Sequence, residues 1–110
     1  MKRDWKLIRA IVREEQTTAW PEPVVLEHKA LCVEAGYVRA HVLRSMASQQ
    51  VQIVQYGEPW QTTEGLEVAE VLANADDLDT VLRELDEKQV GHVSDIVIEL
   101  MRRKARERLG

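Results

Sequence analysis

The apolar residues near the start of the chain recur at spacings of three and four, the period of an amphipathic helix. Trp5, Ile8 and Val12 fall on one stripe, which predicts a helix that buries them. A second helical stripe follows two prolines and ends before a glycine: Val25, His28, Leu31, Cys32 and Ala35. Because proline is tolerated in a first helical turn and glycine closes a helix cheaply, we expect this helix to begin near Pro21 or Pro23 and to end at Ala35.

After that glycine the period of the apolar residues changes from helical to alternating. Val38, Ala40 and Val42 are predicted to point inward and the residues between them outward, as in a half-buried strand. The alternation stops over RSMASQQ and returns in VQIVQY, where the residues expected to share one face are Val51, Ile53 and Gln55. The pattern therefore predicts two antiparallel strands joined by roughly seven polar or small residues.

Three further helical stripes follow the second strand. Their inward positions are predicted to be Leu66, Ala69, Leu72 and Ala73, then Leu78, Val81, Leu82 and Leu85, then Ile96, Val97, Leu100 and Met101. Thr62 or Thr63 is expected to cap the first of these helices and Ser94 the last, because hydroxyl side chains satisfy free amides at a helix start. We expect Asn74 to end the first helix and Gly91 to end the second.

A helix followed directly by a hairpin is typical of the second half of a winged helix. The predicted fold class is therefore α+β and mostly helical: a winged-helix-like domain with a β-hairpin wing and a C-terminal helical extension. We expect one domain over residues 1–110, with the winged-helix-like core in 1–61 and the extension in 62–110 packed on it. A chain of 110 residues that is 45% hydrophobic can bury one modest core.

Charge and composition indicate the cellular location of this domain and exclude one class of partner, the membrane. The net charge is −4, and residues 62–91 hold nine acids and two bases, whereas residues 92–110 hold three acids and five bases. No run approaches the roughly 18 to 20 apolar residues that span a bilayer, so we expect no membrane partner and a cytoplasmic location. The single cysteine, Cys32, agrees with a reducing compartment because it has no partner for an internal disulfide.

Four stretches of the chain resemble, in order, the family called Domain of Unknown Function 2513: MKRDWKLIRAIV, EHKALCVEAGYV, TTEGLEVAEVL and a closing amphipathic helix. The family's motifs Met-Lys-Arg-Asp, His-x-x-Leu-x-x-x-Ala-Gly and Leu-Thr-x-x-Gly match Met1 to Asp4, His28 to Gly36 and Thr62 to Gly65, with Gln61 in place of the leucine. The resemblance implies a winged helix with a helical extension in a bacterial, phage-associated protein. It implies no activity and no functional residue.

The residues themselves argue against an enzyme. Cys32 has only His28 as a neighbour at helical spacing, and both lie on the apolar stripe, where a buried structural role is the commoner one. His41 and His92 stand apart from any CxxC or HxxxH pair, so no metal site is predicted. The glycines are scattered singly, and no phosphate-binding loop or other cofactor site is expected.

Contact with DNA through the wing is the first functional hypothesis. Residues 35–57 contain no acid, and Arg39, His41 and Arg44 lie on the predicted hairpin, with Lys29 on the helix before it. These four residues are the candidate contacts to phosphates. Against this hypothesis, the helix that would enter the major groove carries three acids, and each one weakens an electrostatic affinity for phosphate.

A protein-interaction or dimerisation module is the alternative hypothesis. Trp20, Tyr56 and Trp60 are the candidate anchors, because aromatic side chains are enriched at binding hot spots. The partner would be a host or phage protein or a second copy, with the basic RRKARER of one chain against the acidic residues 62–91 of another. Both hypotheses describe a small, non-enzymatic regulatory module.

Overall fold

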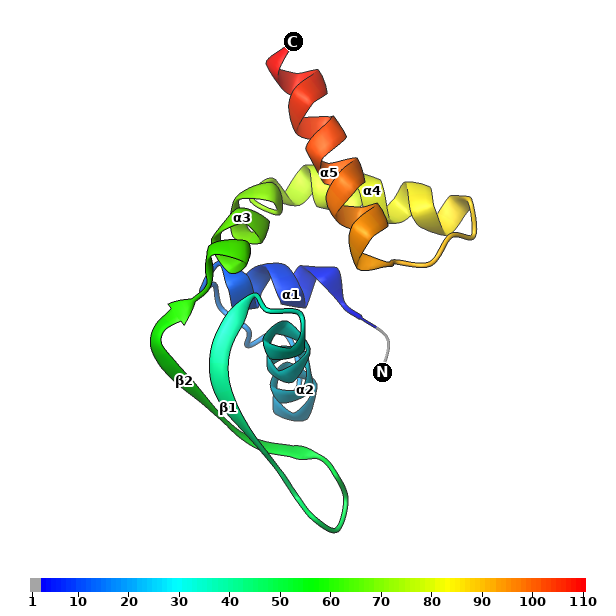
Figure 1. Ribbon diagram of the computed structural model, residues 1–110. Coiled ribbons are helices and arrows are strands. Elements are labelled where there is room, and N and C mark those ends of the chain that lie inside the picture. The colour runs from blue at the N-terminus through cyan, green and yellow to red at the C-terminus, as the bar shows by residue number, and fades with distance from the viewer. Residues whose placement is uncertain (1–2) are drawn as a thin grey trace. The chain divides into compact units, whose positions relative to one another are not determined.

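The computed structural model describes residues 3–110, which form five helices and one two-stranded antiparallel sheet. In chain order the elements are α1 (Trp5–Val12), α2 (Glu22–Glu34), β1 (Val38–Arg44), β2 (Val51–Gln61), α3 (Thr63–Val71), α4 (Ala75–Glu87) and α5 (Ser94–Leu109) (Figure 1). The chain divides into two compact units, one that ends at Ala69 and a second that comprises Glu70–Gly110. The α+β, mostly helical class and the order of the elements agree with the prediction.

Helix α1 is the core of the first unit. Trp5, Ile8 and Val12 are buried as predicted, and Leu7 and Ile11 are buried beside them. Asp4 caps the helix, because its carboxylate accepts hydrogen bonds from the amides of Lys6 and Leu7 at 3.0 and 3.2 Å.

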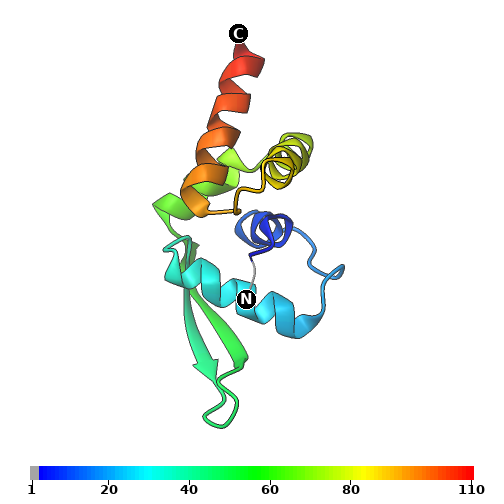
Figure 2. The same cartoon turned by 90° about the vertical axis from the view of Figure 1, so that its right-hand side faces the viewer.

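Helix α2 crosses α1 rather than running alongside it, as Figure 2 shows with α1 seen end-on. Val25, His28 and Cys32 are buried as predicted, but Leu31 is only half-buried and Ala35 is exposed. Ala35 is the residue after the helix, where the chain turns away at Gly36, whose φ is +82°. No helix lies between α1 and α2, so the described residues contain no separate middle helix.

The hairpin contains a bulge that the alternation of its sequence conceals. Leu43 pairs with Ile53 and Arg44 with Val51, so Gln52 is an extra residue on β2. The extra residue turns Val51 inward, where it is buried, and leaves Ile53 facing outward. The prediction that Val51 and Ile53 share a face was therefore wrong, because a one-residue shift reverses the faces of a strand.

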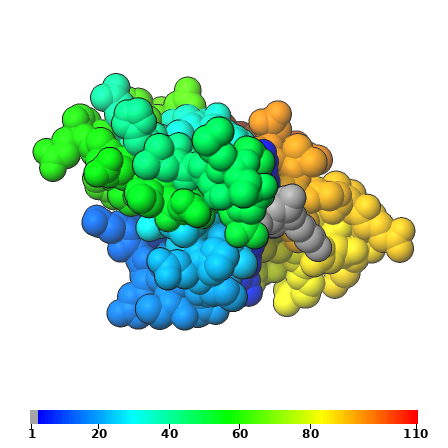
Figure 3. Space-filling view, turned by 90° about the horizontal axis from the view of Figure 1, so that it is seen from below, coloured from blue at the N-terminus to red at the C-terminus, as the bar shows by residue number. Residues whose placement is uncertain are grey.

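Strand β2 also runs past Tyr56, where the predicted strand ended, to Gln61. A second irregularity lies between the pairs Val38 with Gln61 and Ala40 with Tyr56, so residues 57–60 bulge away from β1. Seen from the end of the unit that carries the hairpin tip, the hairpin lies beside α2 and the loop before it (Figure 3).

The start of α3 is fastened to the end of α2 by Thr62. Its hydroxyl donates to the carbonyl oxygens of Gly36 and Tyr37 and accepts from the amide of Gly65 at 2.9 Å. Thr62, rather than Thr63, is thus the cap among the two predicted residues. Gly65 lies so close to β1 that a Cβ built on it would be 1.8 Å from the carbonyl oxygen of Tyr37. Only glycine fits this approach without a shift of the backbone.

The ends of the last three helices differ from the prediction at three residues. Asn74 does not end α3 but caps α4, since its side chain accepts from the amide of Asp77 at 3.0 Å. Gln89, with a φ of +57°, takes the left-handed position after α4 that was expected of Gly91. Val93 is the capping residue of α5, and its side chain makes no capping hydrogen bond, so Ser94 is the first helical residue instead.

Most of the predicted apolar stripes of these helices are confirmed. Seven of the predicted inward residues are buried: Ala69, Leu72, Leu78, Val81, Leu85, Val97 and Met101. Leu82 and Leu100 are half-buried. Leu66, Ala73 and Ile96 are exposed instead. Within the second unit, basic residues of α5 pair with acids of α4 in the same chain: Lys104 with Glu84 and Arg108 with Asp77.

Candidate functional site

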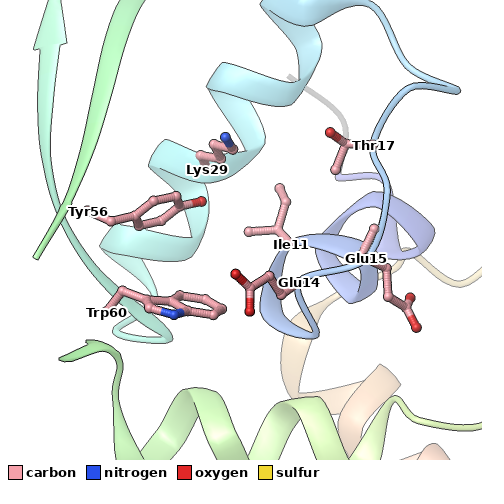
Figure 4. Close-up of a pocket in the computed structure, with 8 residues that line it drawn as sticks. Ile11, Glu14, Glu15, Thr17, Lys29, Tyr56 and Trp60 are labelled. Carbon is pink, nitrogen blue, oxygen red and sulfur yellow. The ribbon is translucent and has the colours of Figure 1, made fainter. Parts of the chain in front are cut away.

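A pocket of about 200 Å³ opens in the first unit between the end of α1, the middle of α2 and strand β2 (Figure 4). Ala10 and Ile11 of α1 form its apolar floor. Its walls come from three segments of the chain and are made by Glu14, Glu15, Thr17, Lys29, Tyr56 and Trp60. A concave, mainly apolar site with a few polar groups is typical of a ligand pocket.

Two aromatic rings of β2 form one wall of the pocket. The ring centroids of Tyr56 and Trp60 are 5.5 Å apart and their planes are tilted by 56°, within the range of favourable aromatic pairs. Tyr56 pairs with Ala40, an inward residue of β1, so its ring points toward the helices rather than away from them. The structure thus brings together two of the three predicted aromatic anchors.

Trp20, the third predicted anchor, is not part of this pocket. Its indole Nε1–H donates to the Asp4 carboxylate at 2.9 Å, so it supports the cap of α1. Asp4 in turn donates its backbone N–H to Nε2 of His28 at 2.9 Å. Nδ1 of His28 lies 2.9 Å from the carbonyl oxygen of Val24, which can only accept, and therefore carries the proton of a neutral ring.

One cation and one anion line the pocket without pairing with other described residues. The Lys29 ammonium lies 5.4 Å from the centroid of the Tyr56 ring, close enough for a cation–π attraction. The Glu14 carboxylate extends toward Trp60 (Figure 4). Among the residues from 3 to 110, neither Lys29 nor Glu14 forms an ion pair. Glu15, by contrast, pairs with Arg9 and Arg13 and points away from the rings.

Glu14 holds an unusual backbone conformation. Its φ is +56°, and it follows α1 at the left-handed position that glycine occupies most cheaply. The amide of Glu15 donates to the carbonyl oxygen of Ala10 at 2.8 Å and closes the helix end around it. A side chain at such a position costs on the order of 1 kcal/mol relative to glycine. The sequence carries no signal for this turn, because glutamate is uncommon at the left-handed position of a turn.

The hydroxyl of Tyr56 remains neutral at physiological pH. Desolvation of its partly buried ring raises its pKa to about 12, with smaller contributions from negative charge at Cys32 and at Glu14. In the described part of the chain, no side-chain hydrogen bond joins the Tyr56 hydroxyl, the Trp60 indole N–H or the Thr17 hydroxyl to another residue. The Tyr56 hydroxyl points into the pocket (Figure 4) and is therefore available to a ligand.

The four predicted nucleic-acid contacts do not meet on one surface. Arg39 and His41 are exposed on the outward face of the hairpin, together with Leu43. Arg44 faces α2, where it pairs with Glu27 at 3.3 Å and donates to the carbonyl oxygen of Gln49 at 2.8 Å. Lys29 lies in the aromatic pocket.

Glu27 of α2 fastens the hairpin to this helix. Besides its pair with Arg44, it accepts a hydrogen bond from the amide of Val51 at 3.1 Å. The cation of Arg44 is therefore balanced within the unit. A shallow hollow beside this contact is lined by two acids of α2, Glu22 and Glu27, and has no basic side chain in its lining.

Cys32 is buried, and its thiol is not activated as a nucleophile. Burial raises the pKa of its thiol to about 12, although the charge of Arg3 lowers it slightly. Both nitrogens of His28 are occupied by backbone groups, so no free base stands beside the thiol. Among residues 3–110, no group of three or more His, Cys, Asp or Glu side chains is arranged to hold a metal ion. None of the described helices combines the length and apolar composition needed to cross a bilayer.

The residues that carry the family resemblance have structural roles here. Asp4 and His28 bond to each other, and Gly36, Thr62 and Gly65 form the contact that begins α3. Met1 and Lys2 of the first motif lie outside the described residues. No family model matches the chain, no curated protein matches it and no solved structure matches it. The interpretation of the pocket therefore depends on its own geometry.

Proposed function

We propose that the unit ending at Ala69 is a winged-helix-like, non-enzymatic recognition module that binds a protein segment through the aromatic pocket. The observation that carries the proposal is the convergence of Tyr56 and Trp60 on one pocket with an apolar floor. Trp and Tyr are the residues most enriched at protein-binding hot spots. A pocket of about 200 Å³ is large enough for one large apolar side chain.

The polar groups around the rings favour a peptide segment as the ligand. The side chains of Tyr56, Trp60 and Thr17 carry hydrogen-bond donors that bond to no other described residue. Backbone carbonyl oxygens on either side of a bound side chain would satisfy them. Hydrogen bonds of this kind fix the orientation of a segment whose apolar anchor supplies the affinity.

The family resemblance agrees with this proposal. In the proposed winged-helix-like arrangement, α2 corresponds to the recognition helix and the hairpin corresponds to the wing. Residues of the motifs hold these elements together, whereas the residues that form the walls of the pocket lie outside the motifs, apart from Lys29. A shared fold with a separate binding surface is a common arrangement.

A direct test begins with selection of short random peptides on the immobilised chain, followed by fluorescence anisotropy of the enriched peptides. Trp60→Ala should weaken binding at least tenfold, since removal of a hot-spot residue commonly costs 2 kcal/mol or more. Trp60→Phe keeps an aromatic wall and should bind more tightly than Trp60→Ala. Enriched peptides that bind Trp60→Ala as well as they bind the wild type would refute the proposal.

Contact with nucleic acid through the outward face of the hairpin is the second candidate function. It is favoured by the absence of acids in residues 35–57 and by the exposure of Arg39 and His41 on one face. Arg39→Glu isolates this hypothesis, because Arg44 already pairs with Glu27. Binding of a labelled random duplex at low salt that disappears in Arg39→Glu would support this function, and no binding at low salt would exclude it.

A further inference from the structure

We propose, resting on the proposed function, that the segment bound in the aromatic pocket is dipolar. It carries a large apolar side chain, an acidic residue on one side that pairs with Lys29, and a basic residue on the other side that pairs with Glu14. This proposal narrows the ligand from any segment with a large apolar side chain to a segment whose flanks carry opposite charges.

The first observation is the placement of two opposite charges around one apolar floor. Lys29 comes from α2 and Glu14 from the turn after α1, and the two side chains approach Ile11 from opposite sides (Figure 4). Within residues 3–110 no ion pair joins them to each other or to a third residue. Both charges are therefore available to a ligand.

The second observation concerns the cations beside Glu14. Arg9 and Arg13 of α1 are its nearest basic residues in sequence, but both pair with Glu15. Arg13 also donates to the carbonyl oxygen of Ala69 at 2.8 Å. The charge of Glu14 is therefore not balanced by its own helix.

The third observation is the backbone of Glu14. A residue with a Cβ is held at a φ of +56°, where glycine would close α1 at lower cost. Strain of this kind at the rim of a pocket supports a role for the side chain that it places there. The role that fits is to present a carboxylate beside Trp60 and Tyr56.

Charge complementarity selects the dipolar segment over the alternatives. A segment with only acidic flanks would pair with Lys29 but meet the like charge of Glu14, and a segment with only basic flanks would have the reverse mismatch. A segment with neutral flanks would leave both charges partly desolvated without a partner. A segment with one flank of each sign satisfies both charges and is disfavoured by neither.

The experiment uses blocked peptides with one central large apolar residue and four kinds of flank: acidic and basic in either order, acidic only, basic only, and neutral. Each is titrated against the wild-type chain, Lys29→Glu, Glu14→Lys, and the double reversal. Matched controls are Arg39→Glu and Glu34→Lys, which change the net charge equally at exposed positions outside the pocket.

The wild type should bind one of the mixed-flank orders tighter than the neutral peptide, by up to about fivefold for each exposed ion pair. Lys29→Glu should shift the preference to basic flanks and Glu14→Lys to acidic flanks, while the double reversal should prefer the opposite mixed order. The two controls should leave the ranking unchanged.

Three results overturn the inference in different ways. If all peptides bind equally and binding still depends on Trp60, the dipolar ligand is wrong but the pocket stands. If no peptide binds, or if binding is the same in Trp60→Ala, the proposed function fails together with the inference. Tight binding of a free aromatic amino acid in place of the blocked peptides would also overturn it, because the ligand would then be a small molecule.

Discussion

Gly65 offers the sharpest test of how the first unit is assembled. A Cβ at this position would lie 1.8 Å from the Tyr37 carbonyl oxygen and 2.8 Å from its carbon, whereas real Cβ contacts essentially never fall under 3.0 Å. Gly65→Ala must therefore move the start of α3 by more than about 1 Å. The obstacle is backbone on both sides, so no side chain can rotate away to relieve it.

The expected loss of stability follows from three contributions. Because alanine has a higher helix propensity than glycine, the substitution by itself would stabilise α3 by up to about 1 kcal/mol. The overlap with Tyr37 costs about 1 to 3 kcal/mol or more, as overpacking does elsewhere. The displacement also breaks hydrogen bonds of Thr62, each with a net value of about 0.5 to 1.5 kcal/mol. We expect Gly65→Ala to lower the free energy of unfolding by about 2 to 4 kcal/mol.

Urea titration followed by tryptophan fluorescence measures this loss in the right part of the molecule. All three tryptophans, Trp5, Trp20 and Trp60, precede Ala69, so their emission reports on the first unit. Gly57→Ala is the matched control, because a Cβ there would meet only ordinary contacts at 3.8 Å or more. A Gly65→Ala variant as stable as Gly57→Ala would refute the close approach of α3 to Tyr37.

Three further predictions concern residues around the site. His28→Leu should lower the free energy of unfolding by about 1 to 3 kcal/mol more than His28→Gln, because leucine leaves the amide of Asp4 without an acceptor; chemical denaturation of both variants measures this. Glu14→Gly should raise the free energy of unfolding by about 0.5 to 1 kcal/mol, because glycine adopts the left-handed φ without strain. The same variant should bind the selected peptides more weakly, and Glu14→Gln should give no gain in stability. The buried Cys32 thiol should react with a thiol reagent only on unfolding. Since its pKa rises from 9.0 to about 12 on folding, the unfolded chain ionises first, and stability should fall between pH 9 and 12 in the wild type but less in Cys32→Ala.

The apolar periodicity was sufficient to predict the helices and the hairpin. A stripe such as Trp5, Ile8 and Val12 is buried whatever the neighbouring element is, so its spacing alone determines the local structure. The bulge at Gln52 was not predictable in this way. Val51 and Ile53 are both apolar, so the alternation alone does not indicate which of them is buried. In the structure the amide of Val51, beside the bulge, donates to Glu27, a contact with a residue far away in the sequence.

The pocket was predictable only in part. Tyr56 and Trp60 were identified as anchors because aromatic residues are enriched at binding hot spots, but Lys29 was assigned to phosphate contact on charge alone. Its contact with Tyr56 spans two elements, and the bond of His28 to Asp4 likewise joins residues far apart in the chain. Contacts of this kind depend on how α1, α2 and β2 meet, which no local pattern reveals. Glu14 was not identified because the sequence does not reveal its left-handed backbone conformation, which places its side chain at the pocket.

The most direct test of the proposed pocket is a two-dimensional ¹H–¹⁵N NMR titration of the labelled chain with an enriched peptide, observed at the three tryptophan indoles. The Trp60 side chain lines the pocket, whereas the indole N–H of Trp20 donates to Asp4 and Trp5 is buried in the core. We predict that the Trp60 signal moves on binding while the signals of Trp20 and Trp5 stay in place. Binding that leaves the Trp60 indole unmoved and shifts the amides of Arg39 and His41 would contradict the proposal and place the binding surface on the outward face of the hairpin.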